Sequence, residues 1–136
     1  MSILDELAAK ARQRVVAAEQ KHPLADVARS ARLLAQTSPV PSFYQALQNA
    51  SLAYICEVKR ASPSKGMIAP DFPYRQIALD YQNAGAAAIS CLTEPFYFQG
   101  SDQYLWEIAS EVDIPVLRKD FVIDDYMILQ AAAYGA

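Results

Sequence analysis

Apolar residues recur at helical spacing through the first part of the chain. Ser2 and Asp5 have the form of a capping box at the start of this pattern. Pro23 ends the first helix and can begin a second, and Ser42 is placed to cap a third, short helix. We therefore predict a helical N-terminal extension over residues 1–50. The positions that set the spacing in the first helix are Leu4, Leu7, Ala8, Ala11, Val15 and Ala18.

From residue 51 the pattern changes to apolar, strand-like runs that alternate with helical segments. The runs cover residues 52–58, 86–92 and 114–117. The helical segments cover residues 74–84, about 102–110 and 124–134. The middle run is almost continuously apolar, which is typical of a strand buried on both faces of a parallel sheet. The pattern predicts an α/β fold with about three βα units over residues 51–136.

Units of this kind wind right-handedly into either a doubly wound sheet or a closed barrel. A barrel of eight units takes about 250 residues, so a chain of 136 residues can hold only part of one. The chain stops after Gly135 and Ala136, where a fourth strand is expected. If the units form a barrel, it is a truncated barrel that belongs to a longer protein. Its open strand edges favour self-association of the isolated chain.

Charge and composition exclude several classes of partner. A net charge of -3 leaves no basic stripe for nucleic acid. No apolar run approaches the roughly 20 residues of a membrane-spanning helix. The N-terminus carries Asp5 and Glu6 and so lacks the basic start of a signal peptide. We predict a cytoplasmic protein with no nucleic-acid or membrane partner.

The two cysteines, Cys56 and Cys91, each lie inside an apolar run. Two thiols do not make a disulfide framework, so both are predicted to be reduced and buried. With His22 they are the only soft metal ligands in the sequence. No metal site is therefore predicted.

Charged and hydroxyl side chains follow the first predicted strand. Glu57 and Lys59 alternate with Cys56 and Val58, so the acid and the base share one face. Such a neighbouring pair forms either a catalytic pair or an ion pair. The next stretch, residues 62–66, combines two serines, a proline, a lysine and a glycine. It has the composition of an anion-binding turn, and equally of a simple loop turn.

The run ICEVKRASPSKG at residues 55–66 resembles the signature of the indole-3-glycerol-phosphate synthase family, Glu-x-Lys-x-x-Ser-Pro-Ser. Two further stretches agree with that family in order and spacing: residues 92–94 leading to 97–101, and residues 115–121. The resemblance covers essentially the whole chain. It implies the N-terminal part of a TIM (β/α)8 barrel preceded by the helical extension.

The resemblance also implies an activity. Enzymes of that family act in tryptophan biosynthesis on 1-(o-carboxyphenylamino)-1-deoxyribulose 5-phosphate, a sugar phosphate bearing an anthranilate ring. They close a ring onto the sugar carbonyl carbon and release carbon dioxide and water, which makes them lyases. The family requires no cofactor or metal. Functional residues of such barrels stand at the C-terminal ends of the strands.

Three residues match catalytic positions of the family. Lys119 matches the lysine that acts as general acid on the carbonyl oxygen, and its alternative is a solvated residue after a strand. Lys59 matches a lysine that contacts charged groups of the substrate, and its alternative is a salt bridge with Glu57. Glu57 matches an active-site glutamate. Arg118 points to the other face and is expected to be structural.

Three further residues match substrate-binding positions. Ser62 matches a serine near the substrate phosphate, with a loop turn as its alternative. Phe98 and Phe121 match aromatic residues that line the pocket of the anthranilate ring, with core packing as their alternative.

Two other functions stay open at this point. The layout also suits another phosphate-binding barrel enzyme, such as phosphoribosylanthranilate isomerase, but that chemistry does not need all three motifs. A non-catalytic assembly or scaffold module derived from a barrel is the second. If the chain is part of a synthase, the isolated 136 residues are expected to have little or no synthase activity, because the family glutamate after strand four lies beyond them.

Overall fold

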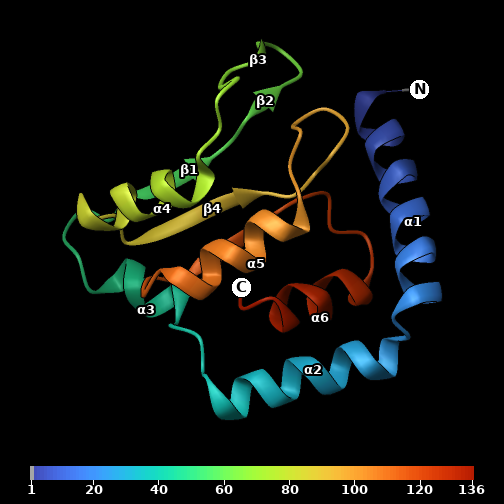
Figure 1. Cartoon of the computed structure of the whole chain (residues 1–136), viewed down its shortest axis with the longest axis horizontal. Helices are drawn as coiled ribbons and strands as arrows, with labels where there is room; N and C mark the ends of the chain where they lie inside the picture. The colour runs from blue at the N-terminus through green and yellow to red at the C-terminus, as the bar shows by residue number, and fades with distance from the viewer. Residues whose placement is uncertain (1) are drawn as a thin grey trace. The chain divides into compact units, whose positions relative to one another are not determined.

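The computed structural model describes residues 2–136 (Figure 1). These residues fall into two compact units. The helical unit runs to Pro39 and includes Phe121–Tyr134. The α/β unit comprises Val40–Asp120 with Gly135–Ala136. Across residues 2–136, no helix is long and apolar enough to cross a membrane.

The helical unit begins with α1 (Ile3–Lys21), whose start is closed by the predicted capping box. The Ser2 hydroxyl accepts from the Asp5 backbone N–H, and the Asp5 carboxylate accepts from the Ser2 backbone N–H at 2.9 Å. Both otherwise unpaired amides are thereby satisfied. The buried side of α1 consists of Leu7, Ala11 and Val15, three of the positions that gave the helical spacing.

Two further helices, α2 (Leu24–Thr37) and α6 (Asp125–Ala133), pack against each other in this unit. Their shared core cluster contains Val15, Val27, Tyr126 and Met127. Buried Tyr126 donates its hydroxyl hydrogen to the His22 carbonyl at 3.0 Å, which ties α6 to the α1–α2 connection. An apolar cluster and the hydrogen bond from Tyr126 to His22 thus help to hold the helical unit together.

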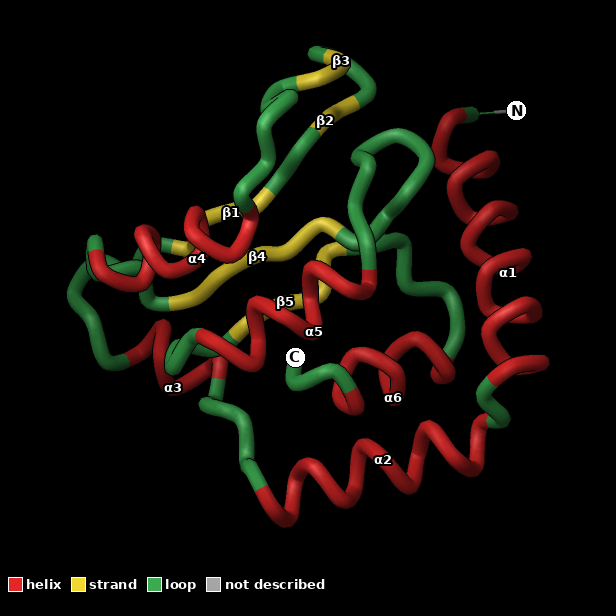
Figure 2. Tube along the Cα trace, viewed as in Figure 1, coloured by secondary structure: helices red, strands yellow, loops and turns green. Residues whose placement is uncertain are grey.

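The α/β unit contains a three-stranded parallel sheet in the order β1-β4-β5 (Figure 2). The strands are β1 (Ile55–Val58), β4 (Ala88–Leu92) and β5 (Val116–Lys119). The helices are α3 (Phe43–Gln48), α4 (Tyr74–Asn83) and α5 (Asp102–Glu111). Each strand is joined to the next by a helix, and α4 and α5 pack beside each other against the sheet. This confirms the predicted α/β fold with parallel strands.

Burial along the strands follows their place in the sheet. All five residues of the central strand β4 are buried, as its apolar run predicted. In β5 burial alternates, so that Val116 and Arg118 are buried while Leu117 and Lys119 are exposed. This period of two is the normal alternation of a strand with two different faces.

Several predicted boundaries were wrong. Strand β1 begins three residues later than predicted, and β5 is shifted to Val116–Lys119, so Lys119 lies within the strand. The residue before β5 is Pro115, which has no N–H to donate to a ladder. The loop over residues 60–73 contains a short antiparallel hairpin of β2 (Ala61–Ser62) and β3 (Gly66–Met67), too short to give an alternating pattern.

The two cysteines differ in burial. Both are free thiols; Cys91 is buried as predicted, whereas Cys56 is only partly buried. The prediction was wrong for Cys56 because β1 lies at the edge of the sheet, with a partner strand on one side only. Burial raises the pKa of the Cys91 thiol to about 12.

Candidate active site

Glu57 lies between two lysines. Its Oε1 is 3.1 Å from Nζ of Lys59, and its Oε2 is 4.0 Å from Nζ of Lys119. The hydroxyl of Ser90 donates a hydrogen bond to the same Oε2 at 3.1 Å. One carboxylate therefore gathers side chains from all three parallel strands.

The sheet register explains how these groups meet. Glu57 is the direct neighbour of Ser90 in the β1–β4 pairing, and Ser90 is the neighbour of Leu117 in the β4–β5 pairing. Two residues further along each edge strand, Lys59 and Lys119 return to the same face. The small Ser90 side chain leaves room for the longer chains to meet above the central strand. The three charged side chains stand at or next to the carboxyl ends of their strands, and Ser90 lies in the middle of β4.

Glu57 is also fixed through its backbone. The hydroxyl of Tyr81, on α4, donates to the Glu57 carbonyl at 3.2 Å. This bond ties the edge strand β1 to the helix that covers the sheet. The Glu57 side chain is therefore mounted on a backbone with support from both β4 and α4.

The three charged side chains remain open to solvent. Their side-chain exposures are 30% for Glu57, 33% for Lys59 and 50% for Lys119. Ion pairs at this exposure contribute only about 0–1 kcal/mol to stability. Two positive charges face one negative charge, so the cluster attracts anions. At 4.0 Å the Lys119 ammonium is beyond hydrogen-bonding distance of Glu57 and can turn toward a ligand.

Arg118 points away from this cluster, as expected for a structural residue. Its side chain is 4% exposed and donates to Thr93 Oγ1 at 3.2 Å and to Asp102 Oδ1 at 2.9 Å. Thr93 in turn donates its hydroxyl hydrogen to Asp120 Oδ2 at 2.6 Å, and its backbone N–H bonds the Lys119 carbonyl at 3.1 Å. This buried network joins the ends of β4 and β5 beside Lys119. The sequence argument did not predict a network that joins Thr93, Asp102 and Asp120 to Arg118.

The loops after β1 and β4 meet next to these strand ends. Ser62 is 9% exposed, and its hydroxyl accepts from the Lys65 backbone N–H at 3.3 Å, so it helps to form the hairpin turn. Ala61 donates its N–H to the carbonyl of Phe98 at 3.3 Å. The α/β unit therefore contains five of the six expected site residues: Glu57, Lys59, Ser62, Phe98 and Lys119.

The comparisons with known proteins agree on one family. A family model described as indole-3-glycerol phosphate synthase matches residues 4–136. The chain belongs to the indole-3-glycerol phosphate synthase family. It is 50% identical over 134 residues to the indole-3-glycerol phosphate synthase of Ruminiclostridium cellulolyticum, covering 98% of this chain and 51% of that protein. The match to the Endomicrobium trichonymphae protein of the same name is 51% identical and covers 98% and 52%.

A third relative extends the same result. The indole-3-glycerol phosphate synthase of Lacticaseibacillus paracasei is 48% identical over 134 residues, covering 98% of this chain and 51% of the relative. The chain thus spans about half the length of the curated relatives it matches. The family membership rests on residues 4–136, and the resemblance seen in three sequence motifs is confirmed.

The sixth residue that matches an indole-3-glycerol-phosphate synthase position, Phe121, belongs to the helical unit. It is partly buried there. Its assignment to the substrate pocket stays a prediction. The sequence analysis missed Ser90, whose hydroxyl donates a hydrogen bond to Glu57. It could have been noticed as the one polar residue of the otherwise apolar strand β4.

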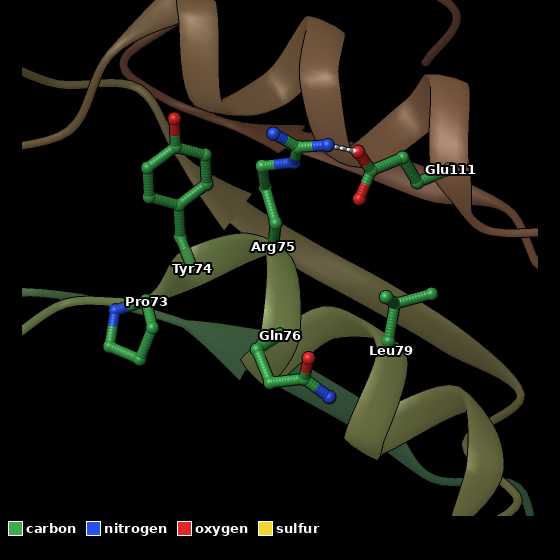
Figure 3. A pocket seen from close by; sticks show the side chains of 6 residues that line it. All are labelled: Pro73, Tyr74, Arg75, Gln76, Leu79 and Glu111. Carbon is green, nitrogen blue, oxygen red and sulfur yellow. Dashed lines mark hydrogen bonds and ion pairs between the residues drawn. The ribbon is translucent and has the colours of Figure 1, made fainter.

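A second surface feature is lined by none of the six residues assigned to the candidate site. It is an open depression on α4 and the end of α5, lined by Pro73, Tyr74, Arg75, Gln76, Leu79 and Glu111 (Figure 3). Arg75 and Glu111 form an ion pair across it, and Tyr74 donates to Glu107 Oε2 at 2.6 Å. That hydrogen bond to a carboxylate raises the pKa of Tyr74 to about 12. These contacts join the two covering helices.

Proposed function

We propose that this chain carries the first three strands of an indole-3-glycerol-phosphate synthase barrel and acts, as part of the whole enzyme, as a lyase in tryptophan biosynthesis. The substrate is 1-(o-carboxyphenylamino)-1-deoxyribulose 5-phosphate. In this proposal residues 1–50 form a helical extension, and residues 51–136 form three units of a (β/α)8 barrel. The observation that carries it is the meeting of Lys59, Glu57 and Lys119 at the carboxyl ends of the two edge strands of the parallel sheet, on either side of β4.

The reaction needs a proton donor at one defined oxygen. The ring carbon that bears the carboxylate attacks the sugar carbonyl carbon, and the carbonyl oxygen becomes a hydroxyl as the bond forms. Carbon dioxide then leaves and restores the aromatic ring, and the hydroxyl departs as water when the second ring gains its double bond. We assign the proton donation to Lys119, whose side chain is 50% exposed and whose ammonium is only loosely held at 4.0 Å from Glu57.

Lys59 and Glu57 have a supporting place in this proposal. Lys59 lies 3.1 Å from Glu57, so its ammonium is held over the sheet where an anionic group of the substrate can bind. Glu57 separates the two ammonium groups and so fixes their positions relative to each other. Ion pairing within the protein and contact with the substrate are compatible for these residues.

Three further residues are proposed to bind the substrate. Ser62 is fixed in the hairpin turn beside exposed Ser64 and Lys65, a turn whose hydroxyls and cation suit the substrate phosphate. Phe98 and Phe121 are assigned to the anthranilate ring. The proposal needs no cofactor and no metal. The 136-residue chain by itself is expected to show little or no turnover, because its relatives are about twice as long.

The test is reconstitution of synthase activity. The chain is mixed with the part of the Ruminiclostridium cellulolyticum relative that it does not match, and formation of indole-3-glycerol phosphate is followed. Lys119→Met is compared with Lys21→Met, the same change at an exposed lysine that ends α1. We expect turnover that requires both pieces, survives Lys21→Met and falls by at least about 100-fold with Lys119→Met.

The opposite outcome is equally clear. Absence of turnover from two pieces shown to be folded and associated would overturn the proposal and favour a scaffold role. Turnover that persists in Lys119→Met would remove the assignment of that residue as the acid while leaving the enzyme class in place.

A further inference from the structure

The loop that follows β4 is built around a buried carboxylate. Glu94, two residues after the strand ends, is 2% exposed. Its Oε1 accepts from the backbone N–H of Phe96 at 2.9 Å. Its Oε2 accepts from the backbone N–H groups of Tyr97 at 2.7 Å and Phe98 at 3.0 Å. Three successive amides therefore converge on one side chain of the same loop.

This arrangement gives Glu94 a definite task. A buried carboxylate is costly unless it is hydrogen-bonded, and charge-assisted bonds from backbone amides are among the strongest available. Successive N–H groups that point to one spot form a concave anion site, which the Glu94 side chain fills from within the chain. The Glu94 carbonyl also accepts from the Gly100 N–H at 2.8 Å. Glu94 therefore stabilises the loop through its side chain, which binds the amides of residues 96–98, and through its carbonyl, which binds the amide of Gly100.

The loop has little freedom to take another path. Gln99 adopts a left-handed backbone conformation with φ of 51°, which costs free energy for a residue with a side chain. A Cβ at Gly100 would stand 2.3 Å from the Leu92 carbonyl oxygen, so the loop packs directly on the strand backbone. The contacts of Glu94 must outweigh this strain.

Phe98 is the residue at which this loop meets the site. Its N–H is held by Glu94, and its carbonyl accepts the Ala61 N–H at 3.3 Å, next to Ser62. We propose that Glu94 is a positioning residue that sets the place of Phe98 and so determines recognition of the substrate's aromatic ring. This inference rests on the proposed function, because Phe98 is assigned to that ring there.

Glu94→Gln is the sharpest variant. The size of the side chain is kept, but an amide offers one acceptor oxygen where the carboxylate offers two. Whichever way the amide turns, its NH2 group faces at least one of the three backbone N–H groups, which then loses its acceptor. Glu19→Gln is the matched control, since Glu19 is exposed on α1.

Activity is measured in the reconstituted enzyme as separate kcat and KM values. We expect Glu94→Gln to raise KM about tenfold or more, with a smaller change in kcat, and Glu19→Gln to change neither. Phe98→Leu should raise KM in the same way. Because Glu94 acts through Phe98, the double variant should be no worse than Phe98→Leu alone. Additive effects of the two changes, or an unchanged KM in Glu94→Gln, would overturn the inference.

A second measurement does not depend on activity. Amide hydrogen exchange of the wild-type chain should show protection at Phe96, Tyr97 and Phe98, and Glu94→Gln should lose it at one or more of these amides while α4 stays protected. Unprotected amides in the wild type would overturn the inference even if the variant failed to fold. An inactive wild-type mixture with these amides protected would count against the proposed function and leave the Glu94 loop in place.

Discussion

Replacing Arg118 by methionine is the most informative test of how the sheet is held beside Lys119. The Arg118 side chain is 4% exposed, and its guanidinium bonds Thr93 and Asp102. It also lies 3.7 Å from Oδ2 of Asp120, whose side chain is 0% exposed. Methionine keeps much of the side-chain length but donates no hydrogen bond. The change therefore leaves the Asp120 carboxylate buried without its cation.

The expected loss of stability is large. Removing one partner of a buried ion pair costs about 3–5 kcal/mol, because the other charge stays uncompensated. A domain of this size has a free energy of unfolding of about 5–15 kcal/mol in total. Asp120→Asn added to Arg118→Met removes the buried charge, so the double variant should be more stable than Arg118→Met alone.

Urea unfolding measures the effect. It is followed by far-ultraviolet circular dichroism and by the fluorescence of Trp106, which lies on α5 of the same unit. Arg75→Met is the matched control: Arg75 is 58% exposed in its pair with Glu111, so its loss should change the free energy of unfolding very little. A cost of Arg118→Met no greater than that of Arg75→Met would refute the reasoning.

Three further outcomes are expected. Because burial raises the pKa of Cys91 to about 12, iodoacetamide near neutral pH should modify only Cys56 in the folded chain and both thiols in urea, as mass spectrometry will show. The Tyr74 hydroxyl lowers the pKa of Glu107. The hydrogen bond from Tyr74 to Glu107 therefore stabilises the fold at a pH above 4.5, the pKa of this carboxyl in the unfolded chain, and the stabilisation is lost as the pH falls through the lowered pKa of the folded state. Tyr74→Phe should accordingly destabilise the protein at pH 7 but much less in acid. We propose that the isolated chain self-associates through its edge strands, where Ile55 is 48% exposed. In analytical ultracentrifugation the sedimentation coefficient should rise with protein concentration, and it should rise less for Ile55→Lys. A monomer at all concentrations would contradict this.

The helices and their ends could be predicted from local sequence. A cap acts within one turn, so Ser2 with Asp5, Ser42 and Ser101 each mark a helix start without knowledge of the rest of the chain. Strand alternation is equally local, and it placed Glu57 and Lys59 on one face, where they form an ion pair at 3.1 Å. These parts of the site were within reach of the sequence.

Contacts between strands could not be predicted from the sequence, because they depend on how distant segments pair. The distance between Lys119 and Glu57 depends on the register of two strand pairs, and register is set by the packing of the whole sheet. The network of Arg118, Thr93 and Asp120 likewise joins residues up to 27 positions apart. The Glu94 loop is local, but three amides bound by one carboxylate leave no pattern in residue types.

Ser90 shows how the two kinds of information combine. It occupies the middle of a strand whose other residues are apolar, and a hydroxyl there must find a partner when it is buried. Its partner is the Glu57 carboxylate, which in turn holds Lys59 and lies near Lys119. A larger residue on this face of β4 would fill the space in which the side chains of the two edge strands meet. The small, buried Ser90 of the central strand therefore allows the Glu57 carboxylate to lie near both Lys59 and Lys119.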